Sequence, residues 1–193
     1  KIKIKKLEEA ENKLVEKTIV RDVIKLKSVA AYGMIDDQIG YIKLTTFSSS
    51  TDKEIVTALN SLKKRGMSKL ILDLRFNGGG YLHQAIHVAD QFLDKHQMIV
   101  YTKGAHTKKE SQFASEKGAF KSGDLVILVN STTASASEIV SGAIQDHKRG
   151  VIIGRRTFGK GLVQSPLMLE DSSEIRITTS RSVSYTHLRA HET

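Results

Sequence analysis

The sequence contains no cysteine and a single proline, and no apolar stretch approaches the roughly 18 residues that a membrane-spanning helix needs. The missing cysteines exclude disulfides, thiolate metal sites, iron–sulfur clusters and a cysteine nucleophile. Any nucleophile must therefore be Ser, Thr, Lys or a carboxylate. Of the 193 residues, 39% are hydrophobic and 26% are charged, which is typical of one soluble globular domain rather than a disordered or collagen-like chain.

The net charge of +9 raises the question of nucleic acid as a partner. The basic residues are spread along the chain among acidic ones, as in Lys5-Lys6-Leu7-Glu8-Glu9, and no aromatic residues are interleaved with them. Nucleic-acid binding needs clustered charge. We therefore expect a solvated basic surface and no nucleic-acid partner.

The two ends of the chain need separate treatment. The start, KIKIKKLEEA, has neither an initiator Met nor an apolar signal core, which indicates an excerpt from a longer protein. The end, VSYTHLRAHET, is what one reading frame of a transposon-end sequencing adapter would encode. We expect residues 182–193 to be non-native and the natural chain to be interrupted near Arg181. No function is assigned to His187, His191 or Tyr185.

The central part of the chain alternates between strand and helix patterns. Residues 1–27 hold two strand-like runs, KIKIKKL and KTIVRDVIKL, which suggest the remnant of another domain. From Ile39 onward, apolar strand patterns alternate with helices that present one apolar face, such as Ile55, Leu59 and Leu62. This alternation predicts an α/β fold with a mainly parallel sheet, crossover helices and a binding site at the carboxyl ends of the strands. The predicted strands cover residues 39–47, 69–74, 98–102, 124–130, 151–154, 162–169 and 174–181, and the helices cover 52–65, 82–93 and the segment after residue 135.

Three loops rich in small residues follow predicted strands and should meet at one sheet edge. They contain Asn77-Gly78-Gly79-Gly80, the stretch from Ser131 to Ser137, and Gly159-Lys160-Gly161. A Ser at a strand-to-helix turn can present its hydroxyl to a substrate while amides of the helix N-terminus face an oxyanion. Ser and Thr are also the usual helix caps, so the Ser cluster alone does not establish catalysis.

A catalytic serine needs a base, and Lys160 is a better candidate than any histidine. A lysine between two glycines with few polar neighbours can lose its charge and act as a base, and Ser with Lys is a known dyad. His83 and His87 are one helical turn apart and could share a metal, but no third ligand is evident, so we expect no metal.

The loop around Lys160 also resembles a phosphate-binding P-loop. Gly154-Arg155-Arg156-Thr157-Phe158-Gly159-Lys160 matches the first seven positions of that motif. The eighth position must be Ser or Thr with a helix behind it, whereas Gly161 and a strand-like segment with Pro166 follow here. An NTPase is therefore disfavoured.

Taken together, three motifs resemble those of the carboxyl-terminal processing proteases, also called tail-specific proteases. The similarity extends from Val29 to Arg181, with the motifs in the family's order and at its separations. The motifs are LDLRFNGGGYL, VNSTTASASEIVSGAIQD and GRRTFGKGLVQ.

This resemblance implies the roles of the site residues. Ser135, 25 residues before Lys160, would be the nucleophile, with Lys160 as general base and Gln164 as the residue that orients it. The oxyanion would be bound by the backbone amides of Gly79 and Ala136. Asn77, Gly78 and Gly80 would support that loop, in which many family members have Pro where this chain has Gly78.

The resemblance also implies the wider organisation. Residues 1–27 would be the last strands of a PDZ domain and a linker, and residues 28–181 an incomplete Ser-Lys protease core of the crotonase/Clp-protease-like α/β fold. The expected activity is endoproteolysis near protein C-termini, without a cofactor. The partners would be proteins or peptides with accessible C-termini, and a homo-oligomer or an adaptor protein is compatible with the family. The expected location is the periplasm or the extracytoplasmic membrane surface.

Two alternative functions remain open on the sequence. A crotonase-like acyl-CoA hydratase or isomerase would share the fold and the oxyanion amides, but it would lack the set of Ser135, Lys160 and Gln164 and would need no PDZ remnant. A noncatalytic scaffold or peptide-binding relative is the other alternative, and the presence of all three of these residues argues against it.

Overall fold

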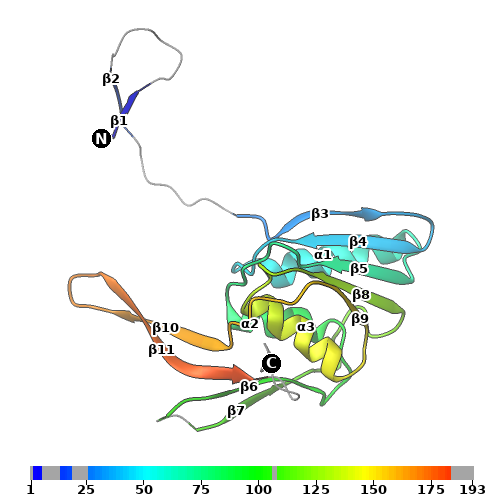
Figure 1. The fold of residues 1–193 in the computed structure, drawn as a ribbon. Helices are drawn as coiled ribbons and strands as arrows, with labels where there is room; N and C mark the ends of the chain where they lie inside the picture. The colour runs from blue at the N-terminus through cyan, green and yellow to red at the C-terminus, as the bar shows by residue number, and fades with distance from the viewer. Residues whose placement is uncertain (1, 6–13, 19–25, 106–107, 184–193) are drawn as a thin grey trace.

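The computed structural model describes residues 2–5, 14–18, 26–105 and 108–183. Its centre is a five-stranded sheet with the order β3-β4-β5-β8-β9 (Figure 1). Strand β3 pairs antiparallel with β4, and the remaining neighbours are parallel. The predicted α/β class with a mainly parallel sheet is thus confirmed. The strands are β3 (Val29–Met34), β4 (Ile39–Leu44), β5 (Lys69–Asp73), β8 (Asp124–Val129) and β9 (Val151–Gly154).

Three helices supply the crossovers: α1 (Thr51–Lys64), α2 (Leu82–Asp90) and α3 (Ala136–Asp146). Helix α1 has acidic residues in its first turn and basic residues in its last, which complements the helix dipole, and Gly66 ends it at a φ of 95°. Its Ile55, Leu59 and Leu62 are fully buried, as predicted.

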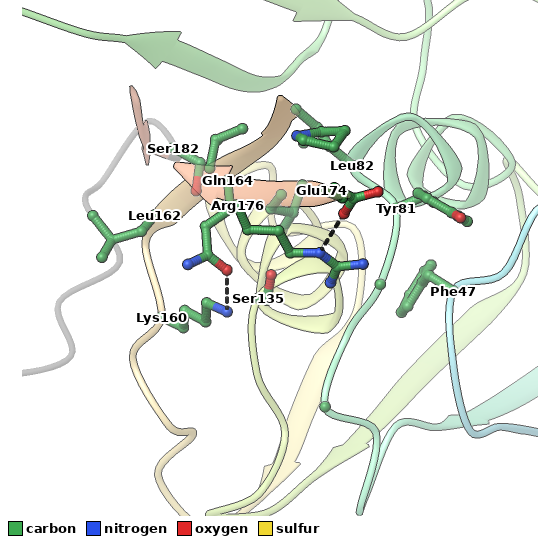
Figure 2. A pocket seen from close by; sticks show the side chains of 15 residues that line it. Phe47, Tyr81, Leu82, Ser135, Lys160, Leu162, Gln164, Glu174, Arg176 and Ser182 are labelled. Carbon is green, nitrogen blue, oxygen red and sulfur yellow. Dashed lines mark hydrogen bonds and ion pairs between the residues drawn. The ribbon is translucent and has the colours of Figure 1, made fainter. Parts of the chain in front are cut away.

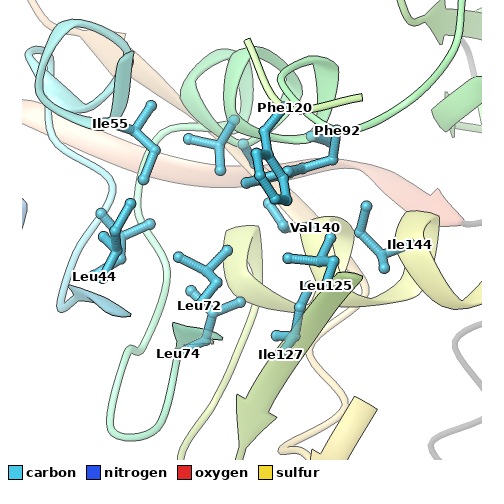
Figure 3. Packing of buried hydrophobic residues seen from close by; sticks show 14 of the residues in the cluster. Leu44, Ile55, Leu72, Leu74, Phe92, Phe120, Leu125, Ile127, Val140 and Ile144 are labelled. Carbon is cyan, nitrogen blue, oxygen red and sulfur yellow. The ribbon is translucent and has the colours of Figure 1, made fainter. Parts of the chain in front are cut away.

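The core lies between the sheet and the helices (Figure 3). Its fully buried side chains include Leu44, Leu72 and Ile127 from the sheet and Val140 and Ile144 from α3. Burial of each such side chain stabilises the fold by about 1.5–3 kcal/mol relative to exposure. Because α3 is held this firmly, the residues at its N-terminus have a fixed position.

A second, four-stranded sheet has the order β10-β11-β6-β7 and is antiparallel throughout. The sequence analysis placed the strand at 98–102 within the strand–helix alternation, but β6 belongs to this second sheet. An apolar run such as Ile99-Val100 shows that a strand is buried, not which sheet it joins. Its members are β6 (Met98–Lys103), β7 (Glu110–Phe113), β10 (Leu162–Met168) and β11 (Glu174–Val183).

The ends of the chain are described only in part. Strands β1 (Ile2–Lys5) and β2 (Leu14–Lys17) form an antiparallel pair, so the second strand begins earlier than predicted. Much of the predicted run KTIVRDVIKL lies outside the described residues, as do residues 184–193 of the suspected adapter segment. Strand β11 continues two residues past Arg181, where Ser182 and Val183 pair with Thr102 and Tyr101 of β6.

Candidate active site

One cavity of about 470 Å³ lies where the predicted loops meet. The loops after β5, β8 and β9 leave neighbouring parallel strands, so they converge at the carboxyl edge of the main sheet. The cavity, called the pocket below, is lined by Ser135, Lys160 and Gln164 together with Gly78 and Gly80 (Figure 2). The structure therefore brings together the three side chains that the sequence analysis selected.

Ser135 lies immediately before α3, in a backbone conformation that is unusual for a residue with a side chain. Its φ and ψ are 56° and −116°, and its side chain is half-buried at the pocket wall. Such a conformation costs about 1–3 kcal/mol and persists only where surrounding contacts impose it. A sharp strand-to-helix turn of this kind is suited to presenting a hydroxyl at the start of a helix.

Glu138, whose carboxylate is fully buried, contacts the backbone of Ser135. Oε2 accepts hydrogen bonds from the backbone amides of Ser135 (2.8 Å) and Lys160 (2.9 Å). Oε1 accepts from the Gly159 amide (2.6 Å) and the Thr157 hydroxyl (2.7 Å). A single carboxylate thus fixes the backbone of both candidate dyad residues relative to each other.

The sequence analysis did not assign a role to Glu138. The spacing Ser135-x-x-Glu138 is that of a capping box, in which the third helical residue accepts a hydrogen bond from the cap residue's amide. This pattern could have indicated the bond to Ser135. The bonds to Gly159 and Lys160 span about 20 residues of sequence and depend on the tertiary fold.

We expect Glu138→Gln to lower kcat by roughly 10²-fold, because a 1 Å misplacement of reacting groups can cost that much. In glutamine, one carboxylate oxygen is replaced by an NH₂ group, which is a donor. The two N–H or O–H groups that donate to that oxygen would therefore lose their acceptor. The measurement is kcat and KM for a short peptide, together with the unfolding midpoint. Glu116→Gln, at an exposed carboxylate paired with Lys95, is the matched control. An unchanged kcat in Glu138→Gln would show that the carboxylate does not position the dyad.

Lys160 and Gln164 interact directly. Lys160 Nζ donates a hydrogen bond to Gln164 Oε1 at 3.4 Å. Lys160 lies in the loop before β10, and Gln164 lies within β10, where the backbone pairing with β11 shifts register between Val163 and Gln164. Within the described residues, no hydrogen bond joins Lys160 Nζ to Ser135 Oγ, and catalytic hydrogen bonds often tighten only when substrate binds.

The glycine loop lies against the start of α3. Gly79 has a φ of 99°, and a Cβ there would lie 2.8 Å from Ser135 Cβ and 2.9 Å from the Ala136 amide nitrogen. Only glycine allows this approach. The Gly79 amide itself donates to Asn77 Oδ1 at 2.9 Å, whereas Gly78 and Gly80 line the pocket. In this conformation the Gly79 N–H already has an acceptor.

Asn77 holds the loop from inside the protein. Its fully buried side chain donates to the Leu44 carbonyl at 3.0 Å and accepts from Gly79. Its carbonyl accepts hydrogen bonds from the Ala134 amide (3.0 Å) and the Ser137 hydroxyl (3.1 Å). Asn77 therefore links the glycine loop, the serine loop and strand β4.

A buried carboxylate also fixes the base of the glycine loop. Asp73 is 1% exposed and accepts hydrogen bonds from the Tyr41 hydroxyl (2.7 Å) and the Arg75 guanidinium (2.7 Å), with Lys43 Nζ at 3.1 Å. Burial by itself would raise the pKa of Asp73, but hydrogen bonds from Arg75, Tyr41 and Lys43 outweigh it and hold the pKa well below its usual range. This cluster at the end of β5 was not predicted.

The other sequence candidates lie apart from this arrangement. His83 and His87 are exposed on α2, with ring centroids 6.5 Å apart. In residues 2–5, 14–18, 26–105 and 108–183, no group of three or more His, Cys, Asp or Glu side chains is placed to hold a metal. The P-loop-like segment is followed by strand β10 instead of a helix. A phosphate site of that type therefore lacks its helix N-terminus.

Together, the fold and the site define a mixed α/β domain with a serine at a strand-to-helix turn and a lysine in the same pocket. Comparison with known proteins agrees with this class: the sequence profile described as Peptidase family S41 matches residues 38–191. The chain belongs to peptidase family S41.

Individual relatives give the same result. The carboxyl-terminal-processing protease of Synechocystis sp. is 41% identical over 182 residues, which cover 92% of this chain and 42% of that protein. The chloroplastic carboxyl-terminal-processing peptidase 1 of Arabidopsis thaliana is 37% identical over 150 residues, covering 78% of this chain and 31% of that protein. The chain thus spans less than half the length of these relatives.

A solved structure supports the fold. The chain is similar to the photosystem II D1 C-terminal processing protease, with a TM-score of 0.70 and 37% sequence identity. That match covers 81% of this chain and 40% of the other. The resemblance to carboxyl-terminal processing proteases drawn from the sequence motifs is confirmed.

Proposed function

We propose that the chain forms the catalytic core of a serine endopeptidase that cleaves proteins near their C-termini through a Ser135–Lys160 dyad. The observation that carries the proposal is the convergence of Ser135, Lys160 and Gln164 on one pocket at the carboxyl edge of the sheet. Membership of peptidase family S41 supports the same reaction class.

In this mechanism Lys160 acts as the general base. As a neutral amine, it accepts the proton of Ser135 Oγ while that oxygen attacks the carbonyl carbon of the scissile peptide bond. The resulting ammonium then donates its proton to the leaving amine nitrogen, which leaves an acyl group on Ser135. A water molecule, deprotonated by the same lysine, hydrolyses the acyl-enzyme. Gln164 holds the amine through its Oε1 without adding charge.

Backbone amides would stabilise the negative oxygen of the tetrahedral intermediate. Ala136 is the first residue of α3, where amide groups lack helical partners and the helix dipole favours an anion. Gly79 would be the second donor, and its amide would exchange Asn77 Oδ1 for the substrate oxygen as the carbonyl enters. Asn77, Gly78 and Gly80 would support this loop.

The proposal extends to the domain organisation and to the partners of the protein. Residues 1–27 would be the end of a PDZ domain and a linker, residues 28–181 the protease core, and residues 182–193 non-native. The substrates would be proteins or peptides with accessible C-termini, with a homo-oligomer or an adaptor protein as further partners.

The proposed location is the periplasm or the extracytoplasmic membrane surface. The matched relatives come from bacteria and from a plant, where the relative's name places it in the chloroplast. Of the helices in the described part of the chain, none combines the length and apolar character that crossing a bilayer requires.

The alternatives from the sequence are less well supported. An acyl-CoA hydratase or isomerase has no need for a lysine held by Gln164 in the same pocket as a serine at a strained turn. A noncatalytic relative has no need for the buried carboxylate that fixes both residues.

The proposal is tested by mass spectrometry of reaction products. An unstructured protein incubated with the full-length protein should lose a short C-terminal peptide, at a rate that a metal chelator does not change. Hydration of crotonyl-CoA, assayed in parallel, should be absent. Chelator-sensitive cleavage reversed by zinc would instead favour His83 and His87, and hydratase activity without proteolysis would favour the crotonase alternative.

A further inference from the structure

The pocket contains a second cationic side chain, Arg176 of β11, which the proposed mechanism does not use. In Figure 2 its guanidinium extends over the pocket, with Ser135 on one side of it and Phe47 and Tyr81 on the other. The dyad lysine is on the Ser135 side in this view. A peptide bound for cleavage at Ser135 would therefore pass close to Arg176.

Only one of the three guanidinium nitrogens of Arg176 makes a hydrogen bond to a described residue. Arg176 Nε donates to Glu174 Oε1 at 3.0 Å, and these residues lie two apart on β11, so their side chains share one face of the strand. Among the described residues, Nη1 and Nη2 have no hydrogen-bond partner. The Arg176 side chain is 75% exposed, and an exposed ion pair contributes little to stability. The pair therefore has no evident structural task.

The free edge of Arg176 has the chemistry of a carboxylate receptor. Two parallel N–H groups of a guanidinium match the two oxygens of a carboxylate, and such bidentate pairs are among the strongest hydrogen bonds in proteins. Glu174 occupies the Nε position and so orients the plane of the group without covering the Nη edge. Apolar side chains of Phe47, Leu82 and Pro166 line the same pocket.

We propose that Arg176 is a specificity-determining residue that binds a carboxylate of the substrate peptide through Nη1 and Nη2. This inference rests on the proposed peptidase function. A carboxylate is present at the end of every substrate cleaved near its C-terminus, and it is also present in acidic side chains. Arg176 would bind either carboxylate in the same way, and the experiment below distinguishes the terminal carboxylate from an acidic side chain.

The test measures binding and turnover separately, with one peptide in three forms. The first has a free terminal carboxylate and no acidic residue, the second is its C-terminal amide, and the third is the amide with one Gln replaced by Glu. Dissociation constants are measured in the Ser135→Ala background, where no cleavage interferes, and kcat and KM are measured with Ser135 present. Each set is repeated with Arg176→Gln and Arg176→Lys.

We expect the free-carboxylate peptide to bind about tenfold more tightly than its amide, as expected for one charge-assisted hydrogen-bonded pair. In Arg176→Gln this ratio should fall to near one, and Arg176→Lys should restore it only in part because an ammonium cannot bind bidentately. The preference should be seen in KM rather than kcat. Arg65→Gln, at an exposed arginine that does not line the pocket, controls for the change in net charge.

The outcomes separate this inference from the proposed function. Selective binding of the Glu-containing amide, lost in Arg176→Gln, would identify an acidic side chain as the source of the carboxylate. Equal binding of all three peptides, or a preference retained in Arg176→Gln, would overturn the inference even if cleavage occurs. A preference that depends on Arg176 without any cleavage would uphold the carboxylate site and refute the peptidase proposal.

Discussion

Ser135→Ala is expected to lower kcat for peptide hydrolysis by roughly four orders of magnitude or more, as removal of a catalytic serine does in serine hydrolases. The variant lacks the oxygen that forms the acyl-enzyme. Its fold should be retained, because Glu138 contacts the backbone amide of residue 135, which alanine also has. The measurement is the rate of cleavage of an unstructured C-terminal peptide.

The unfolding midpoint and the circular dichroism spectrum of the same preparation show whether the variant is folded. Ser131→Ala, at an exposed position earlier in the same loop, is the matched control and should keep the activity of the unchanged protein. Undiminished turnover by a folded Ser135→Ala variant would refute the assignment of the nucleophile.

Lys160→Arg is expected to be as inactive as Lys160→Ala, although it conserves the positive charge. The proposed role requires a neutral amine that accepts a proton, and a guanidinium remains protonated at any working pH. The measurement is kcat/KM against pH for the protein and both variants, with a short peptide as substrate.

Lys64→Arg, at an exposed position near the end of α1, controls for lysine-to-arginine replacement as such. Substantial activity in Lys160→Arg would show that residue 160 acts as a fixed positive charge. The Ser-Lys mechanism would then be wrong, while the family membership would stand.

The meeting of the three loops at one sheet edge was predictable, because it depends on the order of strands and helices along the chain. Strands that alternate with helices form parallel neighbours, and the loops at their carboxyl ends must meet. The loops that carry Ser135 and Lys160 could therefore be placed at one edge from the sequence alone, whereas Gln164 was selected through the resemblance to the protease family. The antiparallel sheet was not predicted as a unit, because the apolar residues of β6 fit either sheet.

The roles of Glu138 and Asp73 could not be predicted from the sequence. Each is a buried carboxylate whose partners lie far along the chain, such as Lys160 for Glu138 and Tyr41 for Asp73. The hydrogen bonds that offset the free-energy cost of burying such a charge exist only in the folded protein. The Gly79 amide is a similar case, since its bond to Asn77 is a property of the loop conformation.

The measurement that tests the central claim most directly is the identification of the acylated residue. The full-length protein is mixed with a peptide nitrophenyl ester, the reaction is quenched early, and the protein is digested and analysed by mass spectrometry. We expect a burst of nitrophenol equal to the number of active sites and an acyl group on Ser135, with neither in Ser135→Ala. An acyl group on another residue, or an equal burst in Ser135→Ala, would contradict the assignment of Ser135 as the nucleophile.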